Sequence, residues 1–174
     1  MMRPVINVAH GTQSTGGSGE FFAYSMTELA SDLGAHAIGA NLTRVPPGKA
    51  AFPFHHHFAN EEHFFVLSGS GVLRYGAEIY PIARHDYIVN LPGGADRAHQ
   101  LINTGTADLV YLAISTTVVA DVCGYPDSGK TSVRTAPYEE ENSRFLIPDD
   151  CKDSVGYWEL EDGRRVAEIV AKGK

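Results

Sequence analysis

The chain has 174 residues, 43% of them hydrophobic and 20% charged, which is typical of one soluble globular domain. Its formal net charge is −7, which argues against duplex nucleic acid as a partner, because phosphate binding needs a clustered positive field. No apolar run reaches the roughly 18 residues of a membrane span, and residues 1–17 contain no apolar stretch of signal-peptide length. We therefore expect no membrane partner and a cytoplasmic location.

The first 33 residues are predicted to form an N-terminal extension. Residues 11–19, GTQSTGGSG, indicate a flexible lead-in because Gly, Ser and Thr dominate them. Ser25 and Glu28 have the spacing of a capping box, which predicts one short helix near residues 25–28.

From residue 37 the pattern changes to short strands at close spacing. Val, Ile, Leu, Tyr and Thr dominate each strand, and Gly, Pro, Asn or Asp bound it. In HFFVLSGSGVLRYG, the residues Ser68-Gly69-Ser70-Gly71 separate two apolar runs and predict a hairpin. The other predicted strands are AIGANLTRV, EIYPI, DYIVNLP, HQLIN and LVYLAISTTVV.

Six or more short strands with almost no helical periodicity indicate an all-β fold, an antiparallel sandwich or barrel. The chain shows no internal repeat, so we expect one barrel, over residues 34–120. The residues after 120 are more polar and carry Pro126, Pro137 and Pro148. We expect residues 121–174 to form a C-terminal extension that wraps the barrel.

Three consecutive histidines offer a metal chelate. On a strand, His55 and His57 point to one face and His56 to the other, so two imidazoles can converge on one ion. If the chain turns at residues 58–60 and returns as the next strand, either Glu61 or Glu62 can supply an oxygen.

The strand EHFFVL places Glu62, Phe64 and Val66 on one face, but periodicity alone does not tell which face is interior. Further along, His99 opens HQLIN after the loop LPGGADRA. A strand start on a barrel rim is a suitable position for a fourth ligand.

These stretches resemble the two-motif signature of the cupin superfamily. Its first motif is Gly, a spacer, His-x-His, three or four residues, Glu, six residues and Gly. Here Gly48 precedes the histidines, four residues separate His57 from Glu62, and six separate Glu62 from Gly69. The second motif is Pro-x-Gly, a spacer, His, three residues and Asn, and here residues 92–94 lead to His99 and then Asn103.

The resemblance implies a single cupin jelly-roll barrel with one divalent transition metal per chain. The spacing from Glu to Gly in the first motif selects Glu62 over Glu61. Carried over by position, the implied ligands are His55, His57, Glu62 and His99. The residues His56, Glu61 and His63 are then expected to face away from the ion or to line the rim of its site.

This sequence departs from the signature at three points. Six residues rather than five separate Gly48 from His55, and four rather than two separate Gly94 from His99. The Gly-Asp turn that usually opens the second motif is residues 85–86, His-Asp, where the histidine must avoid or tolerate a positive φ. All four ligand types stay in place.

Beyond the motifs, the sequence resembles a group of small single-domain microbial cupins over roughly residues 33–134. The stretches that carry this likeness include LGAHAIGANLTRVPPG, AHQLINTGTADLVYLAIST and YPDSGK. Members of the group are described as sugar-phosphate isomerases, so the resemblance implies an isomerase of that kind.

Residues 124–131, GYPDSGKT, satisfy the phosphate-loop pattern GxxxxGK[ST]. Such a loop aims backbone N–H groups at phosphates and opens a helix, but Pro126 lacks an N–H and Asp127 repels phosphate. The continuation TSVRTAP is β-branched and ends at Pro137. We therefore expect a solvent-exposed turn and no nucleotide site.

Other reactive groups have no partner in the sequence. The cysteines Cys123 and Cys151 lie far apart and form no CxxC pair, so we expect both thiols to be free, as in a reducing compartment. No GxSxG motif is present. We expect His10 and His36 to be ordinary structural or surface residues and His85 to serve a turn.

Three imidazoles and a carboxylate suit Fe(II), Mn(II), Ni(II) or Zn(II), and sequence does not separate these ions. An open position on the ion can bind a hydroxyl–carbonyl pair of a substrate. Candidate acids and bases for proton transfer are Glu61, Tyr75 and Tyr111. Candidates to hold an anionic group such as phosphate are Arg44, Lys49, Arg74 and Arg84, although a solvated surface charge is the simpler interpretation of each.

Three functions remain open. The first is a metal-dependent enzyme on a small polar molecule, of the sugar-phosphate isomerase kind by resemblance. The second is a non-haem iron oxygenase with the same ligands, and the third is a non-catalytic module that binds or senses a sugar. We also expect a homodimer, because a jelly roll has open edges and outer faces that a partner commonly covers.

Overall fold

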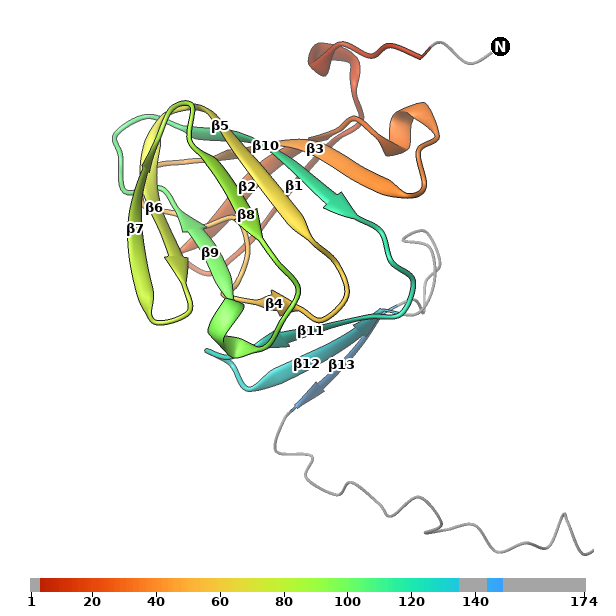
Figure 1. Ribbon diagram of the computed structural model, residues 1–174. Coiled ribbons are helices and arrows are strands. Elements are labelled where there is room, and N and C mark those ends of the chain that lie inside the picture. The colour runs from red at the N-terminus through yellow and green to blue at the C-terminus, as the bar shows by residue number, and fades with distance from the viewer. Residues whose placement is uncertain (1–3, 135–143, 149–174) are drawn as a thin grey trace, which may run out of the picture.

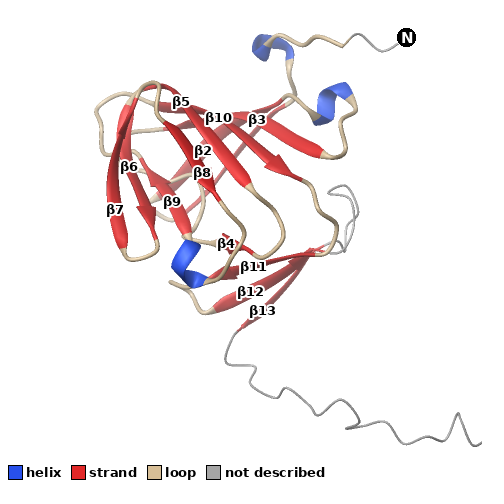
Figure 2. Ribbon diagram, viewed as in Figure 1, coloured by secondary structure: helices blue, strands red, loops and turns tan. Residues whose placement is uncertain are grey.

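The computed structural model describes residues 4–134 and 144–148, which form an all-β jelly roll (Figures 1 and 2). The strands are β1 (Gln13–Ser18), β2 (Phe22–Glu28), β3 (Ile38–Val45), β4 (His56–His57), β5 (Glu62–Ser68), β6 (Ser70–Tyr75), β7 (Glu78–Ala83), β8 (Tyr87–Asn90), β9 (His99–Ile102), β10 (Leu109–Thr116), β11 (Asp121–Tyr125), β12 (Lys130–Arg134) and β13 (Arg144–Pro148). Short 3-10 turns form η1 (Val8–His10), η2 (Ser31–Leu33) and η3 (Ala95–Arg97).

The strands pair into antiparallel sheets. A six-stranded sheet has the order β1-β2-β3-β10-β5-β8, a three-stranded sheet the order β7-β6-β9, and a four-stranded sheet the order β13-β12-β11-β4. An isolated bridge between His55 and His99 joins the last two sheets. In Figure 1, β4 lies between the barrel and the strands β11–β13. The all-β jelly roll predicted from the sequence is therefore confirmed.

Apolar side chains from the six-stranded and three-stranded sheets meet in one core. Alternation along β5 buries Phe64 and Val66, which share this core with Tyr111 of the paired strand β10 and with Leu73 and Leu101 of the three-stranded sheet. The face of β5 that carries Glu62 is therefore the interior face, a choice that periodicity alone had left open.

The hairpin predicted at residues 68–71 is wrong. Strand β5 pairs with β8 and β10, whereas β6 pairs with β7 and β9, so the chain crosses from one sheet to another at Gly69. Gly69 has a φ of 83°, and a Cβ there would collide with the carbonyl oxygen of Asp108. Two apolar runs around a glycine look the same in sequence for a hairpin and for a corner between sheets.

The helix predicted near residues 25–28 is also wrong, because these residues belong to β2. Strand β2 pairs with β1 on one side and β3 on the other, so cross-strand hydrogen bonds use the N–H groups that a capping box would satisfy. The supposed lead-in supplies β1. The tertiary pairing of Tyr24 and Thr27, both good strand formers, overrides the local signal.

The turns at residues 85 and 125–130 agree with expectation. His85 lies in the turn between β7 and β8 with a φ of 80°, so it tolerates the left-handed region that glycine usually occupies. Strands β11 and β12 form a hairpin with an exposed turn, and Lys130 opens a strand rather than a helix. The phosphate-loop pattern there is coincidental.

Some predictions fall on residues outside the described part. These include Cys151, Pro137 and the wrapping of the barrel by residues 135–143 and 149–174. The boundaries at 33 and 120 stay predictions, while β11 and β12 are seen to pair next to β4. Among the described residues, no helix is long and apolar enough to cross a membrane.

Candidate metal centre

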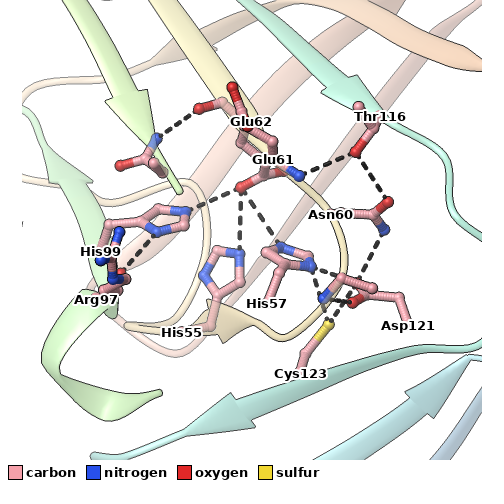
Figure 3. Close-up of polar contacts among 12 residues, drawn as sticks. His55, His57, Asn60, Glu61, Glu62, Arg97, His99, Thr116, Asp121 and Cys123 are labelled. Atoms are coloured by element: carbon pink, nitrogen blue, oxygen red, sulfur yellow. Dashed lines mark hydrogen bonds and ion pairs between the residues drawn. The ribbon is translucent and has the colours of Figure 1, made fainter. Parts of the chain in front are cut away.

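The four predicted ligands come together at one end of the barrel, as Figure 3 shows. His55 and His57 lie on and beside β4, Glu62 opens β5 and His99 opens β9. Reciprocal backbone hydrogen bonds of 3.2 and 2.8 Å hold His55 against His99. The alternation expected for the three histidines is present, because His56 points away from the other two.

The donor atoms lie at separations that suit a shared ion. Oxygen Oε2 of Glu62 is 3.8 Å from Nε2 of His55, 3.5 Å from Nε2 of His57 and 2.9 Å from Nε2 of His99. Two ligands on one ion with bonds near 2.1 Å stand about 3.0–3.4 Å apart. The geometry fits a metal site, and the role of these residues as ligands stays a prediction.

Each imidazole has an acceptor behind it. Nitrogen Nδ1 of His55 donates to the carbonyl oxygen of Pro53 at 2.8 Å, and that of His57 donates to the carboxylate of Asp121 at 2.5 Å. Carbonyl and carboxylate oxygens only accept, so the proton is on Nδ1 and the Nε2 atoms face the centre. Nε2 of His57 is buried with no hydrogen-bond partner among the described residues. A metal ion in place of the Nε2 proton would give this atom a partner.

The surroundings shift the pKa values of His55 and His57 in opposite directions. Burial, and next the nearby His99, lower the pKa of His55 to about 3. Burial also opposes a charged His57, but its contacts with Asp121 and Cys123, and the carboxylate of Glu62 3.5 Å from its Nε2, raise its pKa to about 12. Burial opposes an ionised Glu62 as well, yet the nearby His57 and a hydrogen bond from His99 hold its pKa well below the usual value. Glu62 is therefore an anion at neutral pH.

The neighbouring polar residues point elsewhere, as the sequence predicted. Nδ1 of His56 donates to the carbonyl oxygen of Gly93 at 2.8 Å. His63 contacts the carboxylate of Glu61 at 2.7 Å and accepts a hydrogen bond from the Tyr87 hydroxyl at 2.7 Å. Glu61 is thus engaged on the outer face of β5 rather than at the centre.

A small cavity adjoins the centre. Its lining residues are Ala51, Phe52, His55, Phe64, His99, Gln100, Leu101 and Tyr111. Tyr111 is buried, and burial raises the pKa of its phenol, so the hydroxyl stays neutral. Of the three proposed acids and bases, only Tyr111 lies in this lining.

None of the candidate cations lines the cavity. Arg74 donates two hydrogen bonds, of 2.5 and 2.7 Å, to the carboxylate of Asp127, and its guanidinium lies 3.7 Å from the ring centroid of Phe54. Lys49 donates to the carbonyl oxygen of Glu20. Arg44 and Arg84 are exposed, so the interpretation of both as surface charges holds.

Sequence reasoning did not connect three buried residues with His57. They are Asn60, Asp121 and Cys123. Asp121 is 64 positions from His57 in sequence, and no local pattern connects the two. Cys123 is a free thiol, as predicted.

Comparison with known proteins relates the chain to others of this architecture. Residues 41–115 match the cupin domain family. The chain is 30% identical to a proposed sugar phosphate isomerase from Acidithiobacillus ferrooxidans, with a TM-score of 0.67 and coverage of 77% of this chain and 81% of that one. No curated protein matches this chain.

Two further solved structures share the fold. One is a sugar phosphate isomerase of the cupin superfamily from Silicibacter pomeroyi, with 21% identity, a TM-score of 0.73 and coverage of 84% of this chain and 94% of that one. The other is a predicted oxalate decarboxylase from Thermotoga maritima, with 23% identity, a TM-score of 0.56 and coverage of 66% and 99%. At these identities the likeness concerns the fold alone.

Proposed function

The chain belongs to the cupin family, and from this premise we propose that it is a metal-dependent enzyme acting on a small polar substrate, of the sugar phosphate isomerase kind. The observation that carries the proposal is the convergence of three imidazole Nε2 atoms on one oxygen of Glu62, beside a small cavity. The ligands are His55, His57, Glu62 and His99. They hold one divalent ion per chain, Zn, Mn, Fe or Ni.

The bound ion would act as a Lewis acid on a hydroxyl–carbonyl pair of the substrate. The chain's own residues bind and orient that pair. Tyr111 presents a neutral phenol to the cavity and is suited to donate a hydrogen bond to a substrate oxygen. The rings of Phe52 and Phe64 in the cavity wall exclude water from the reacting end.

The cavity also limits the substrate. The side chains that line it in the described structure include no Lys or Arg. A phosphate group would therefore lie outside the cavity, with the hydroxyl–carbonyl end inside. We propose a small hydroxy-aldehyde or hydroxy-ketone as the substrate class, because its two oxygens suit the open positions of the ion.

The test is a comparison of metal-loaded and chelator-stripped protein on aldose and ketose phosphates in D₂O, followed by proton NMR. We expect interconversion with deuterium incorporated next to the carbonyl, only in the loaded protein. The variant Glu62→Gln should lose this activity. Glu61→Gln should keep it, because Glu61 pairs with His63 on the outer face.

Other outcomes would replace the proposal. Oxygen consumption that depends on iron and on an organic substrate would identify an oxygenase. Saturable sugar binding without any turnover would identify a non-catalytic binding or sensing module.

We further propose a homodimer formed through the outer face of β5 and β8. Leu67, Tyr87 and Val89 are 40%, 60% and 40% exposed there, and β8 is an edge strand. Sedimentation equilibrium should give a dimer that Leu67→Glu and Val89→Glu convert to a monomer. Val5→Glu, at an exposed residue outside this face, should leave the dimer intact.

We also propose a cytoplasmic location, which the free thiol of Cys123 supports.

A further inference from the structure

We propose that Asp121 is a positioning residue for His57, so that strand β11 completes the centre. This inference rests on the proposed role of His57 as a ligand. The observation behind it is the buried carboxylate of Asp121, which is hydrogen-bonded to Nδ1 of His57, the ring nitrogen that points away from Glu62 (Figure 3).

The carboxylate of Asp121 is held in place by several donors. Asp121 is 1% exposed. Its Oδ2 accepts hydrogen bonds from Nδ1 of His57 at 2.5 Å and from Nδ2 of Asn60 at 2.9 Å, and its Oδ1 accepts one from the backbone N–H of Ala59 at 3.1 Å. The thiol of Cys123 lies 3.4 Å from the same Oδ2. A carboxylate with this many partners cannot rotate without breaking them.

Asn60 extends the network to the end of β10. Its Oδ1 accepts hydrogen bonds from the backbone N–H of Val118 at 2.7 Å and from the Thr116 hydroxyl at 3.2 Å. That hydroxyl in turn accepts one from the backbone N–H of Glu61 at 2.9 Å. The loop that carries His57 to Glu62 is thus fixed against residues 116–121.

The consequence for His57 is a defined tautomer. A carboxylate on Nδ1 keeps the proton there and leaves Nε2 as the atom available to a cation. The negative charge also makes the imidazole a stronger electron donor, as second partners of metal-bound histidines do. An asparagine in place of Asp121 would keep the shape and lose the charge.

The same atoms do not form a second metal site. Nδ1 of His57, a carboxylate oxygen of Asp121 and Sγ of Cys123 lie close enough to be considered as ligands. However, the 2.5 Å between Nδ1 and Oδ2 is shorter than the roughly 3.0–3.4 Å between two ligands of one ion. That distance is one of a charge-assisted hydrogen bond.

Asp121 and Cys123 also lie beyond residues 41–115, which match the family model. Strand β11 pairs with β4 at Cys123–His57 and Gly124–His56. The part of the chain that follows the matched domain therefore contacts the centre directly, through both backbone and side chains.

The test is zinc affinity, measured by competition with a chromophoric chelator. Asp121→Asn should bind zinc about 10–100-fold more weakly than the wild type. The control Asp127→Asn removes a carboxylate from the same hairpin, one paired with Arg74, and should leave the affinity unchanged. Unchanged affinity in Asp121→Asn would overturn the proposal.

A second measurement does not require Asp121→Asn to fold. Nitrogen-15 NMR of the wild type, with His57 assigned by its loss in His57→Gln, should show a proton on Nδ1 both without and with zinc. A zinc-loaded His57 with an unprotonated Nδ1 would contradict the proposal. So would a second zinc ion per chain that Cys123→Ala removes.

The two proposals fail differently. If the wild type binds no metal, the proposed function fails, while the Nδ1 proton still reports the contact with Asp121. If the metal binds but Asp121→Asn has no effect on affinity, only the positioning role fails.

Discussion

Two histidines two positions apart sit in opposite electrostatic surroundings. His55 has a carbonyl oxygen behind it, and its pKa is lowered to about 3 by burial and by His99. His57 has the carboxylate of Asp121 behind it, and its pKa is raised to about 12 against the cost of burial. The carboxylate behind His57 outweighs the cost of burial, whereas the carbonyl oxygen behind His55 does not offset burial and the nearby His99.

This asymmetry predicts proton release on metal binding. Because the raised pKa of His57 lies above neutral pH, the metal-free ring keeps its second proton on Nε2, which an ion must displace. Binding near pH 7 should release about one proton per chain, and affinity should rise with pH. Calorimetry in buffers of different ionisation enthalpy measures this directly, and the same apparent enthalpy in all buffers would contradict it.

The four candidate ligands were predictable because their signal is local or follows a motif. Alternation placed His55 and His57 on one face, and the resemblance to the cupin motif, with its fixed spacing from Glu to Gly, implied Glu62 rather than Glu61. Asp121 was not predictable in this way. It reaches His57 only because β11 pairs with β4, and sequence spacing carries no record of that pairing.

At the level of elements, β4 is two residues long and depends on its neighbours for position. The loop before η3 holds it, since the backbone N–H of Gly93 donates to the carbonyl oxygen of His57 at 2.8 Å. On the other side, the ring of His56 packs onto Gly124 of β11 so closely that a Cβ there would clash with it. The glycine is needed for this approach.

Gly124→Ala should therefore lower the free energy of unfolding by about 1–3 kcal/mol through overpacking. The clash partner is a buried ring, so the loss should shrink when His56→Ala is added. Urea unfolding of both single variants and the double variant measures this coupling. Strictly additive losses would show that the contact between Gly124 and His56 is unimportant.

The elements themselves were predicted unevenly. Strands with dense β-branched and apolar residues, such as β3 and β10, appeared where expected. The corner at Gly69 and the strands β1 and β2 were not predicted. The corner depends on close packing of Gly69 against the backbone of Asp108, and β2 depends on its pairing with β3. A local sequence pattern indicates that a strand forms more clearly than it indicates which strands pair with it.

In the whole molecule, the centre lies where the barrel meets the β11–β13 strands (Figures 1 and 3). The barrel supplies the four candidate ligands, and β11 supplies the partner of His57. An all-β sandwich or barrel followed from composition and strand spacing, and the resemblance to cupins implied the jelly roll. The contribution of residues 121–123 could not be predicted, because it depends on the pairing of β11 with the earlier strand β4.

We propose that His55, His57, Glu62 and His99 hold one divalent transition metal. The first measurement to make is elemental mass spectrometry of the purified, tag-free protein, with metal quantified per chain. We predict about one metal ion per chain, reduced in His55→Ala, Glu62→Ala and His99→Ala and retained in His56→Ala, whose side chain points to Gly93. No bound metal after reconstitution, or a loss in His56→Ala that His55→Ala does not share, would contradict the account.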